Sequence, residues 1–263
     1  MRVAIIGGGK MGEAILSRLL AVPGDSACVI EVDPARRRLL EERYQAPVYD
    51  AAPDGIAGAD LVLLSVKPQD VSSVYRALGS LESGQVLVSI MAGVPIAAIR
   101  SGTGHPAIVR AMPNTPAAIG EGFTVWTATP EVPAERWNAV RSLFAQLGQE
   151  WFVLDEKYLD MATAVNGSGP AFVYLFVEAL VDAAVAIGLP RPMAQDLVLQ
   201  TVRGSAAYVQ ASGAHPAQLK NEVTSPAGTT AAGLYQLERH AVRAALQDAV
   251  VAAYQRSREL GNG

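Results

Sequence analysis

The stretch NEVTSPAGTTAAG, residues 221–233, is rich in hydroxyl groups and in residues that favour turns. It holds three threonines, one serine, one proline and two glycines, but no histidine, cysteine or lysine that could serve as a catalytic base. A turn rich in glycine and threonine can present several backbone N–H groups to a carboxylate. These residue types predict an anion-binding turn at Gly228, Thr229 and Thr230, with a threonine hydroxyl beside it.

A second candidate site is the glycine pattern in VAIIGGGKMGEAI, where Gly7, Gly9 and Gly12 follow an apolar run and open a helical pattern. The first glycine of such a pattern permits a tight turn, the second lets the backbone approach a pyrophosphate, and the third lets the helix pack closely on the strand. The helix N-terminus offers N–H groups and a partial positive charge to the phosphates. The pattern predicts a dinucleotide site at the start of the chain.

The residue that holds the adenosine ribose is usually an acid about 20 positions further on. Asp33 stands 21 residues after Gly12, at the end of the expected second strand, and its carboxylate would favour NAD(H) by repelling a 2′-phosphate. Arg36, Arg37 and Arg38 follow, however, and one of them could bind that phosphate. Asp33 is equally suited to cap the helix that starts at Pro34. The sequence is therefore compatible with either cofactor.

Two further loops follow expected strand ends, where ligands bind in sheets of this kind. In SVKPQD, Lys67 could meet the phosphates or a ribose. In AMPNTP, Asn114 could offer its amide to the nicotinamide or the substrate, and the prolines on either side would hold it stiffly.

A base for alcohol dehydrogenation is missing from these motifs. The three histidines, His105, His215 and His240, stand outside them and are interpreted as surface or capping residues. The turn NGSGPAF lacks the lysine that a lysine-based hydroxyacid dehydrogenase would place just after it. Reduction of a C=N bond needs only a hydride and a proton on nitrogen, and a hydroxyl that hydrogen-bonds the nitrogen can suffice. Imine reduction therefore fits these residues better.

The elements that must position these residues fall into two patterns. Up to about residue 155, short apolar runs alternate with helical patterns, which predicts a doubly wound, Rossmann-type α/β domain. The expected strands are Arg2–Ile6, Cys28–Val32, Leu61–Ser65, Val86–Ile90, Ala107–Met112, Phe123–Ala128 and Glu150–Leu154. The expected helices are Met11–Leu20, Pro34–Arg43, Asp70–Leu78 and Ala134–Leu147.

After Asp155 only helical patterns follow, so we predict a dinucleotide-binding domain over residues 1–155 and an all-α domain over residues 156–263. The expected helices are Tyr158–Val165, Ala171–Ile187, Met193–Ala211 and a last one from about Arg239 to Leu260. The helix Ala171–Ile187 is apolar nearly all round, so our hypothesis is that it lies in a subunit interface. Its two charges, Glu178 and Asp182, are interpreted as a solvated or salt-bridged stripe rather than metal ligands.

Composition narrows the class of protein. The formal net charge is −4, which argues against a general nucleic-acid binder. The single cysteine, Cys28, is expected to be buried in a strand. The chain begins with a strand pattern rather than a signal peptide, and its longest uncharged run, residues 161–177, is too short and too broken to span a bilayer. We expect a cytoplasmic protein with no membrane partner and no metal.

The motifs named above, together with VSIMAGV, RAMPNTPA, GLPR and HPAQLKNEVTSPAGTTAAGLYQLE, resemble the pyrroline-5-carboxylate reductase family along essentially the whole chain. The resemblance implies reduction of 1-pyrroline-5-carboxylate to L-proline with NADPH or NADH, the last step of proline biosynthesis. It also implies an N-terminal Rossmann domain and a helical domain that forms homodimers, which can assemble into larger rings.

The resemblance also assigns roles to residues of this chain. Thr230 would be the hydroxyl nearest the imine nitrogen and a proposed proton donor, within a substrate-binding turn that includes Ser225, Gly228 and Thr229. The residues that we predict to contact the cofactor are Gly7, Gly9, Lys10, Met11, Gly12, Asp33, Arg36, Val66, Lys67, Pro68, Ala92 and Asn114.

Three positions depart from the family pattern. Ala227 stands where glycine is commonest, and its methyl group costs about 1 kcal/mol or more if φ is positive there. Asn166 stands where serine is frequent, and Asp33 stands where many NADPH-preferring relatives lack an acid. The alternatives to the leading interpretation are a reductase of another cyclic imino acid, a hydroxyacid dehydrogenase on the same fold, and a nucleotide sensor without turnover.

Overall fold

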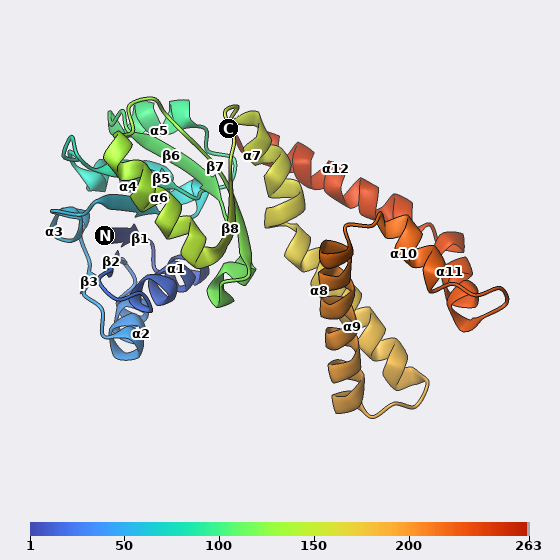
Figure 1. Cartoon of the computed structure of the whole chain (residues 1–263). Helices are drawn as coiled ribbons and strands as arrows, with labels where there is room; N and C mark the ends of the chain where they lie inside the picture. The colour runs from blue at the N-terminus through green and yellow to red at the C-terminus, as the bar shows by residue number, and fades with distance from the viewer. Residues whose placement is uncertain (262–263) are drawn as a thin grey trace. The chain divides into compact units, whose positions relative to one another are not determined.

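A computed structural model describes residues 1–261, which divide into two compact units. The first unit comprises residues 1–170 and the described end of the chain from Ala253, and the second comprises residues 171–252 (Figure 1). The sequence predicted a boundary near Asp155, but residues 156–170 group by their contacts with the first unit. Buried Arg110 is one reason, because its guanidinium pairs with Glu156 at 2.8 Å and with Asp160 at 2.9 Å.

The first unit is built on one sheet of eight strands in the order β3-β2-β1-β4-β5-β6-β7-β8. All neighbouring strands are parallel except β6 and β7. The strands are β1 (Arg2–Ile6), β2 (Ser26–Ile30), β3 (Val48–Tyr49), β4 (Leu61–Leu64), β5 (Val86–Ser89), β6 (Ile108–Met112), β7 (Gly122–Ala128) and β8 (Gly148–Phe152). The strand order reverses between β1 and β4, which is where doubly wound sheets bind ligands. The predicted Rossmann-type domain is confirmed.

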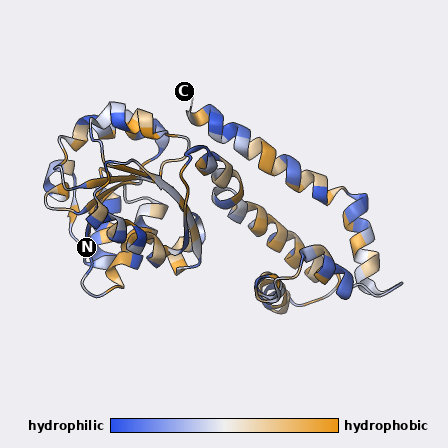
Figure 2. Ribbon diagram, turned by 45° about the horizontal axis from the view of Figure 1, so that its top comes forward, coloured by the Kyte–Doolittle hydropathy of each residue, from blue (hydrophilic) through white to orange (hydrophobic). Residues whose placement is uncertain are grey.

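Helices cover both faces of this sheet. Successive side chains of β1 point to opposite faces, and both sets are buried. Val3 and Ile5 belong to a core that includes side chains of α1 (Lys10–Leu20), α2 (Pro34–Tyr44) and α6 (Ala134–Leu147). Ala4 and Ile6 belong to a second core with α3 (Ala52–Ile56), α4 (Val71–Leu78) and α5 (Ile96–Thr103). Figure 2 shows the hydrophobic character of the strands that lie between these helices. Burial on both faces explains why the strands read as continuous apolar runs.

Several element bounds differ from the sequence predictions. Strand β1 and helix α6 have the predicted bounds, whereas β2 begins and ends two residues before the predicted Cys28–Val32. The reason is its register, since Arg2 pairs with Ser26 and Ile6 with Ile30. Cys28 is buried, as expected, with its thiol 3.2 Å from the carbonyl oxygen of Gly55. The short elements β3, α3 and α5 were not predicted.

No strand follows β8 in the described part of the chain, as predicted. The helices are α7 (Lys157–Ala162), α8 (Gly169–Ala186), α9 (Arg191–Ser212), α10 (Pro216–Glu222), α11 (Thr229–Arg239) and α12 (Val242–Gly261), with a π-helical turn at Thr163–Gly167. Helices α10 and α11 were not predicted, since the stretch 221–233 was read as a turn and no helix was expected between Ala211 and about Arg239. Pro216 is the first residue of α10, and Gly228 is the N-cap residue of α11. The last helix, α12, begins at Val242 rather than near the predicted Arg239.

The second unit has a small core, and its helix α8 exposes large apolar side chains on several sides. Among its described residues, Val181, Ala194 and Val198 form the buried core between α8 and α9. Five large apolar side chains of α8 are between 37% and 66% exposed: Val173, Tyr174, Leu175, Phe176 and Leu180. The helical stretch Lys157–Ala186 would be long and apolar enough to cross a membrane by length and composition alone. A second copy of the chain would equally cover these side chains.

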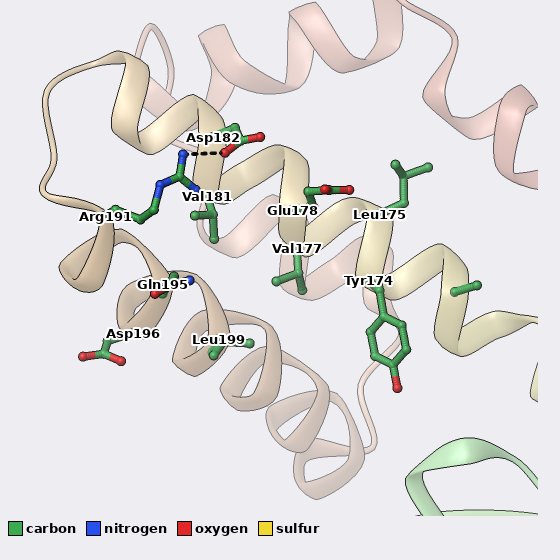
Figure 3. Close-up of a pocket in the computed structure, with 11 residues that line it drawn as sticks. Tyr174, Leu175, Val177, Glu178, Val181, Asp182, Arg191, Gln195, Asp196 and Leu199 are labelled. Carbon is green, nitrogen blue, oxygen red and sulfur yellow. Dashed lines mark ion pairs between the residues drawn. The ribbon is translucent and has the colours of Figure 1, made fainter. Parts of the chain in front are cut away.

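A cavity of about 1020 Å³ lies between α8 and α9 (Figure 3). Its rim carries the predicted acidic stripe, and Asp182 forms an ion pair of 3.0 Å with Arg191. In residues 1–261 no group of three or more histidine, cysteine or acidic side chains could hold a metal ion. The salt-bridged interpretation of Asp182 is confirmed.

Candidate functional site

The glycine-rich loop after β1 has the geometry that its spacing predicted. Gly7 has φ +100°, and a β-carbon there would lie 2.8 Å from the carbonyl oxygen of Ser65, so only glycine fits this turn. A β-carbon on Gly12 would lie 2.0 Å from the carbonyl oxygen of Gly7, which shows how closely α1 packs on the turn. At Gly9 a β-carbon would meet nothing within 4 Å. The outer side of this loop is therefore open to a ligand.

Helix α1 begins directly after Gly9, and no side chain of the described residues caps its N-terminus. Its first N–H groups, which include those of Lys10 and Met11, have no acceptor within the helix. The helix dipole adds a partial positive charge at this end. The arrangement suits a pyrophosphate.

A cavity of about 550 Å³ opens beside this loop, at the carboxyl ends of β1, β2, β3 and β4. Of the predicted cofactor residues it is lined by Gly7, Gly9, Val66 and Lys67. The sequence analysis missed the other polar side chains of the lining, which are Glu31, Asp50, Ser65, Asp70 and Ser73. A cavity lined by residues at the ends of four neighbouring strands fits a dinucleotide bound along the sheet edge.

Asp33 does not stand at the end of the second strand, which is a correction to the sequence analysis. Strand β2 ends at Ile30, and the exposed Asp33 carboxylate caps α2 by accepting a hydrogen bond of 2.9 Å from the N–H of Ala35. The acid next to the strand end is Glu31, whose carboxylate accepts hydrogen bonds from the N–H of Gly8 at 2.8 Å and of Asp33 at 3.0 Å. Counted from Gly12, Glu31 is 19 residues away, so the same spacing rule could have found it.

The guanidinium of Arg36 is engaged by the protein. Its Nε donates to the carbonyl oxygen of Gly8 at 2.6 Å, and its Nη2 donates to Glu13 at 2.5 Å. Burial tends to raise the pKa of Glu13, but hydrogen bonds from Arg36 and Tyr44 and the charge of Arg43 outweigh it and hold that pKa below its usual value. Arg36 therefore ties α2 to the glycine loop and to α1.

The other predicted cofactor residues follow β4, β5 and β6. Lys67 is exposed, and Pro68 opens a 3₁₀ turn, Pro68–Asp70, that leads into α4. Ala92 is half-buried, three residues after β5. Pro68, Ala92 and Asn114 do not line the cavity. Their contacts with a cofactor stay predictions.

Asn114 takes part in a network that the sequence analysis did not foresee. Its Nδ2 donates to Oδ1 of Asn166 at 2.8 Å, and its Oδ1 accepts from the N–H of Phe123 at 3.0 Å. Asn166 in turn donates to the carbonyl oxygens of Met112 and Phe123. Asn166 lies in the π-helical turn, a feature that is frequent at functional sites. Asn166, which stands where serine is frequent in the family, thus fixes the orientation of the Asn114 amide.

In the second unit, the threonine-rich stretch forms a tight turn that leads into α11. The N–H of Gly228 donates to the carbonyl oxygen of Ser225 at 3.1 Å, with Pro226 and Ala227 between them. A β-carbon on Gly228 would lie 2.3 Å from Oγ of Ser225. Gly228 is the N-cap residue of α11, and no described side chain caps this helix. The N–H groups of Thr229 and Thr230 in its first turn are therefore available to an anion.

Ala227 has φ +57°, so the positive value considered from the sequence is the one observed. Proline at the second position and a positive φ at the third are the signature of a type II turn, whose third position favours glycine.

We expect Ala227→Gly to raise the free energy of unfolding by up to about 1 kcal/mol, because relief of the left-handed strain exceeds the added flexibility of the unfolded chain. Chemical denaturation of both proteins measures this difference. The exposed Ala217→Gly in α10, at a helical position, is the matched control and should be destabilising. Equal or lower stability of Ala227→Gly would show that the turn is not strained.

None of the three histidines lies in a predicted site. His105 is buried, which corrects the surface interpretation, and its Nε2 lies 2.9 Å from the carbonyl oxygen of Gln85. His215 caps α10 as expected, accepting at Nδ1 from the N–H of Ala217 at 3.1 Å. His240 ends α11. The turn at residues 225–230 therefore contains hydroxyl and N–H groups without an imidazole.

Comparison with known proteins gives the same family along the whole chain. Residues 156–260 match the family described as pyrroline-5-carboxylate reductase dimerisation, and residues 2–93 match the family described as NADP oxidoreductase, coenzyme F420-dependent. The pyrroline-5-carboxylate reductase of Synechocystis sp. is 42% identical over 99% of this chain and 98% of its own length. That of Pisum sativum is 41% identical over 98% and 95%.

Solved structures agree. The crystal structure of Plasmodium falciparum pyrroline carboxylate reductase with NADP bound has a TM-score of 0.91 and 31% identity, covering 99% of this chain and 98% of that one. The 1-pyrroline-5-carboxylate reductase from Streptococcus pyogenes also has a TM-score of 0.91, with 33% identity over 98% of both chains. From these similarities, and from a glycine loop of the expected geometry, we conclude that this chain belongs to the pyrroline-5-carboxylate reductase family.

Proposed function

We propose that this protein reduces 1-pyrroline-5-carboxylate to L-proline by hydride transfer from NAD(P)H to the cyclic imine carbon. The observation that carries the proposal is the similarity to pyrroline-5-carboxylate reductases over nearly the full length of both chains. Two features of the structure support it: a cavity beside the glycine loop, and a turn at residues 225–230 that leads into a helix whose N-terminus no described side chain caps. The reaction is the last step of proline biosynthesis.

The cofactor would lie along the cavity of the first unit, where its nicotinamide supplies the hydride. The glycine loop would hold the pyrophosphate with the N–H groups at the start of α1, near Lys10 and Met11. Lys67, which lines the cavity, would neutralise phosphate charge. Asn114, oriented by Asn166, would face the reduced ring or the substrate.

The substrate would be held by the turn of the second unit. Because the N–H of Gly228 is already donated to Ser225, the N–H groups of Thr229 and Thr230 are the donors left for the substrate carboxylate. The hydroxyl of Thr230 would hydrogen-bond the ring nitrogen and pass it a proton as the hydride arrives at carbon. An imine nitrogen is basic enough for such a weak donor, so the lack of an imidazole costs little.

Assembly is the second part of the proposal. The dimerisation family matched by residues 156–260 supports a homo-oligomer, and the exposed apolar side chains of α8 are suited to contact between copies. We propose a homodimer through the helical unit, with larger rings built from such dimers. A cytoplasmic protein that binds neither nucleic acid nor membrane accords with its acidic charge and with burial of α8 between copies.

An assay of purified protein with 1-pyrroline-5-carboxylate and either NADPH or NADH tests the reaction. We expect loss of reduced-nicotinamide absorbance matched mole for mole by formation of proline. The six-membered homologue, 1-piperideine-6-carboxylate, tests ring size and should turn over more slowly. Cofactor binding without turnover of either imine would show that the fold serves as a nucleotide sensor.

A further inference from the structure

The adenosine end of the dinucleotide cavity has an acidic lining. Strand β2 ends at Ile30, and Glu31 projects its carboxylate beside the glycine loop, held by the N–H groups of Gly8 and Asp33. These two hydrogen bonds use about half of the acceptor positions of a carboxylate, which has roughly four. Glu31 lines the cavity, and so does Asp50, which directly follows β3. The Glu31 side chain is thus positioned before any ligand arrives.

The arginines that could bind a 2′-phosphate are not part of the cavity lining, and two of them donate hydrogen bonds within the protein. Arg36 donates to Gly8 and Glu13, and Arg37 donates to the carbonyl oxygens of Glu31 at 2.8 Å and Val32 at 3.0 Å. Arg38 is exposed on α2, and none of the three lines the cavity.

Lys67 is the one basic side chain among the described lining residues. It follows β4, which is separated from β2 by β1. Two strand spacings amount to roughly 10 Å, which places the start of the Lys67 loop well away from the ribose end. Among the described residues that line the cavity, a negative group at the end of β2 would therefore meet the Glu31 carboxylate and no basic side chain.

We propose that Glu31, and not Asp33, determines cofactor specificity, and that it makes this enzyme prefer NADH to NADPH. The inference rests on the proposed function only in assuming that the cavity binds a reduced nicotinamide dinucleotide. The carboxylate of Glu31 accepts hydrogen bonds from the ribose hydroxyls of NADH. A 2′-phosphate in the same place brings up to two negative charges against Glu31 and replaces a hydroxyl donor by an acceptor.

Direct binding measures this preference without turnover. The quench of intrinsic tryptophan fluorescence gives Kd values for NADH and NADPH with the intact oligomer, in the wild type, Glu31→Gln and Asp33→Asn. We expect the wild type to bind NADH about tenfold or more tightly than NADPH, since one charge at partial exposure contributes that much. Glu31→Gln keeps an oxygen that can accept from the N–H of Gly8. It should lower the ratio of the Kd for NADPH to the Kd for NADH about tenfold, mainly because NADPH binds more tightly.

The controls separate Glu31 from its neighbours. Asp33→Asn should leave the ratio within about twofold, because asparagine caps a helix as well as aspartate does. Glu42→Gln, an exposed acid of α2, should do the same. Raising the salt concentration should bring the wild-type ratio of the two Kd values closer to one, because screening weakens the repulsion between the 2′-phosphate and Glu31.

Three outcomes would overturn the inference: equal or tighter wild-type binding of NADPH, an unchanged ratio in Glu31→Gln, or a loss of preference in Asp33→Asn. Thermal unfolding and far-UV circular dichroism verify that each variant is folded, and the wild-type ratio tests the inference even if a variant is not. A protein that prefers NADH but does not reduce 1-pyrroline-5-carboxylate would refute the proposed function and leave this inference intact.

Discussion

Replacing Thr230 with alanine should lower kcat about 100-fold, the usual effect of removing one hydrogen-bond donor that acts in the transition state. The Kd for the reduced cofactor should change less than about twofold, because the hydroxyl lies outside the dinucleotide cavity and removes no charge from it. Alanine is a better helix former than threonine, so the first turn of α11 should keep its N–H groups in place. Steady-state kinetics measures the loss of kcat, and titration with the reduced cofactor measures the Kd.

Two variants make the result specific to the hydroxyl. Thr230→Ser keeps the donor and should retain activity within about tenfold of the wild type, because only a methyl group is lost. Thr201→Ala removes a threonine hydroxyl that donates within α9 to the carbonyl oxygen of Leu197, and kcat should stay unchanged. Turnover of Thr230→Ala within threefold of the wild type would mean that the proton reaches nitrogen from water or another residue.

The glycine loop could be predicted in detail because its causes are local. Each of Gly7, Gly9 and Gly12 was assigned a mechanical reason from spacing alone, and the structure contains a positive φ, an open side and a close helix contact at these three positions. Likewise, the long alternation of apolar runs and helical patterns settled the class of fold. Strand β1 and helix α6 have the bounds that their patterns predicted.

The errors have non-local or competing causes. The two-residue shift of β2 depends on its pairing with β1, since Ser26 is polar but is held opposite Arg2 by the ladder. That shift made Asp33 look like the strand-end acid and concealed Glu31. The contact between Asn114 and Asn166 joins residues 52 positions apart, which periodicity cannot reveal.

Short helices escaped prediction for a different reason. Helix α3 has only five residues, and two of them are Pro53 and Gly55. Proline and glycine are typical of turns, so the local sequence did not predict a helix there. Helix α11 begins one residue after Gly228, within a stretch that reads as a loop. The functional consequence is that the threonines belong to a helix N-terminus, which gives them the N–H groups of a first turn.

The exposed face of α8 leads to the second prediction: Phe176→Glu should convert the homo-oligomer into monomers at micromolar concentration. Phe176 is 48% exposed in the single chain and lies on the same side of α8 as Val173 and Leu180, which are also exposed. In a two-fold interface each substitution occurs twice, so two carboxylates would be buried without partners, at several kcal/mol each. Light scattering during size exclusion gives the mass directly.

Because the proposed contact involves a whole side of the helix and not one residue, Leu180→Glu, four residues further along α8, should act in the same direction. Ile119→Glu is the matched control, since Ile119 is 72% exposed in the first unit, and the mass should not change. A wild-type protein that is monomeric and fully active at micromolar concentration would exclude the interface. So would a Phe176→Glu variant of unchanged mass, because a carboxylate tolerated at Phe176 means that solvent covers this side of α8 in the assembly.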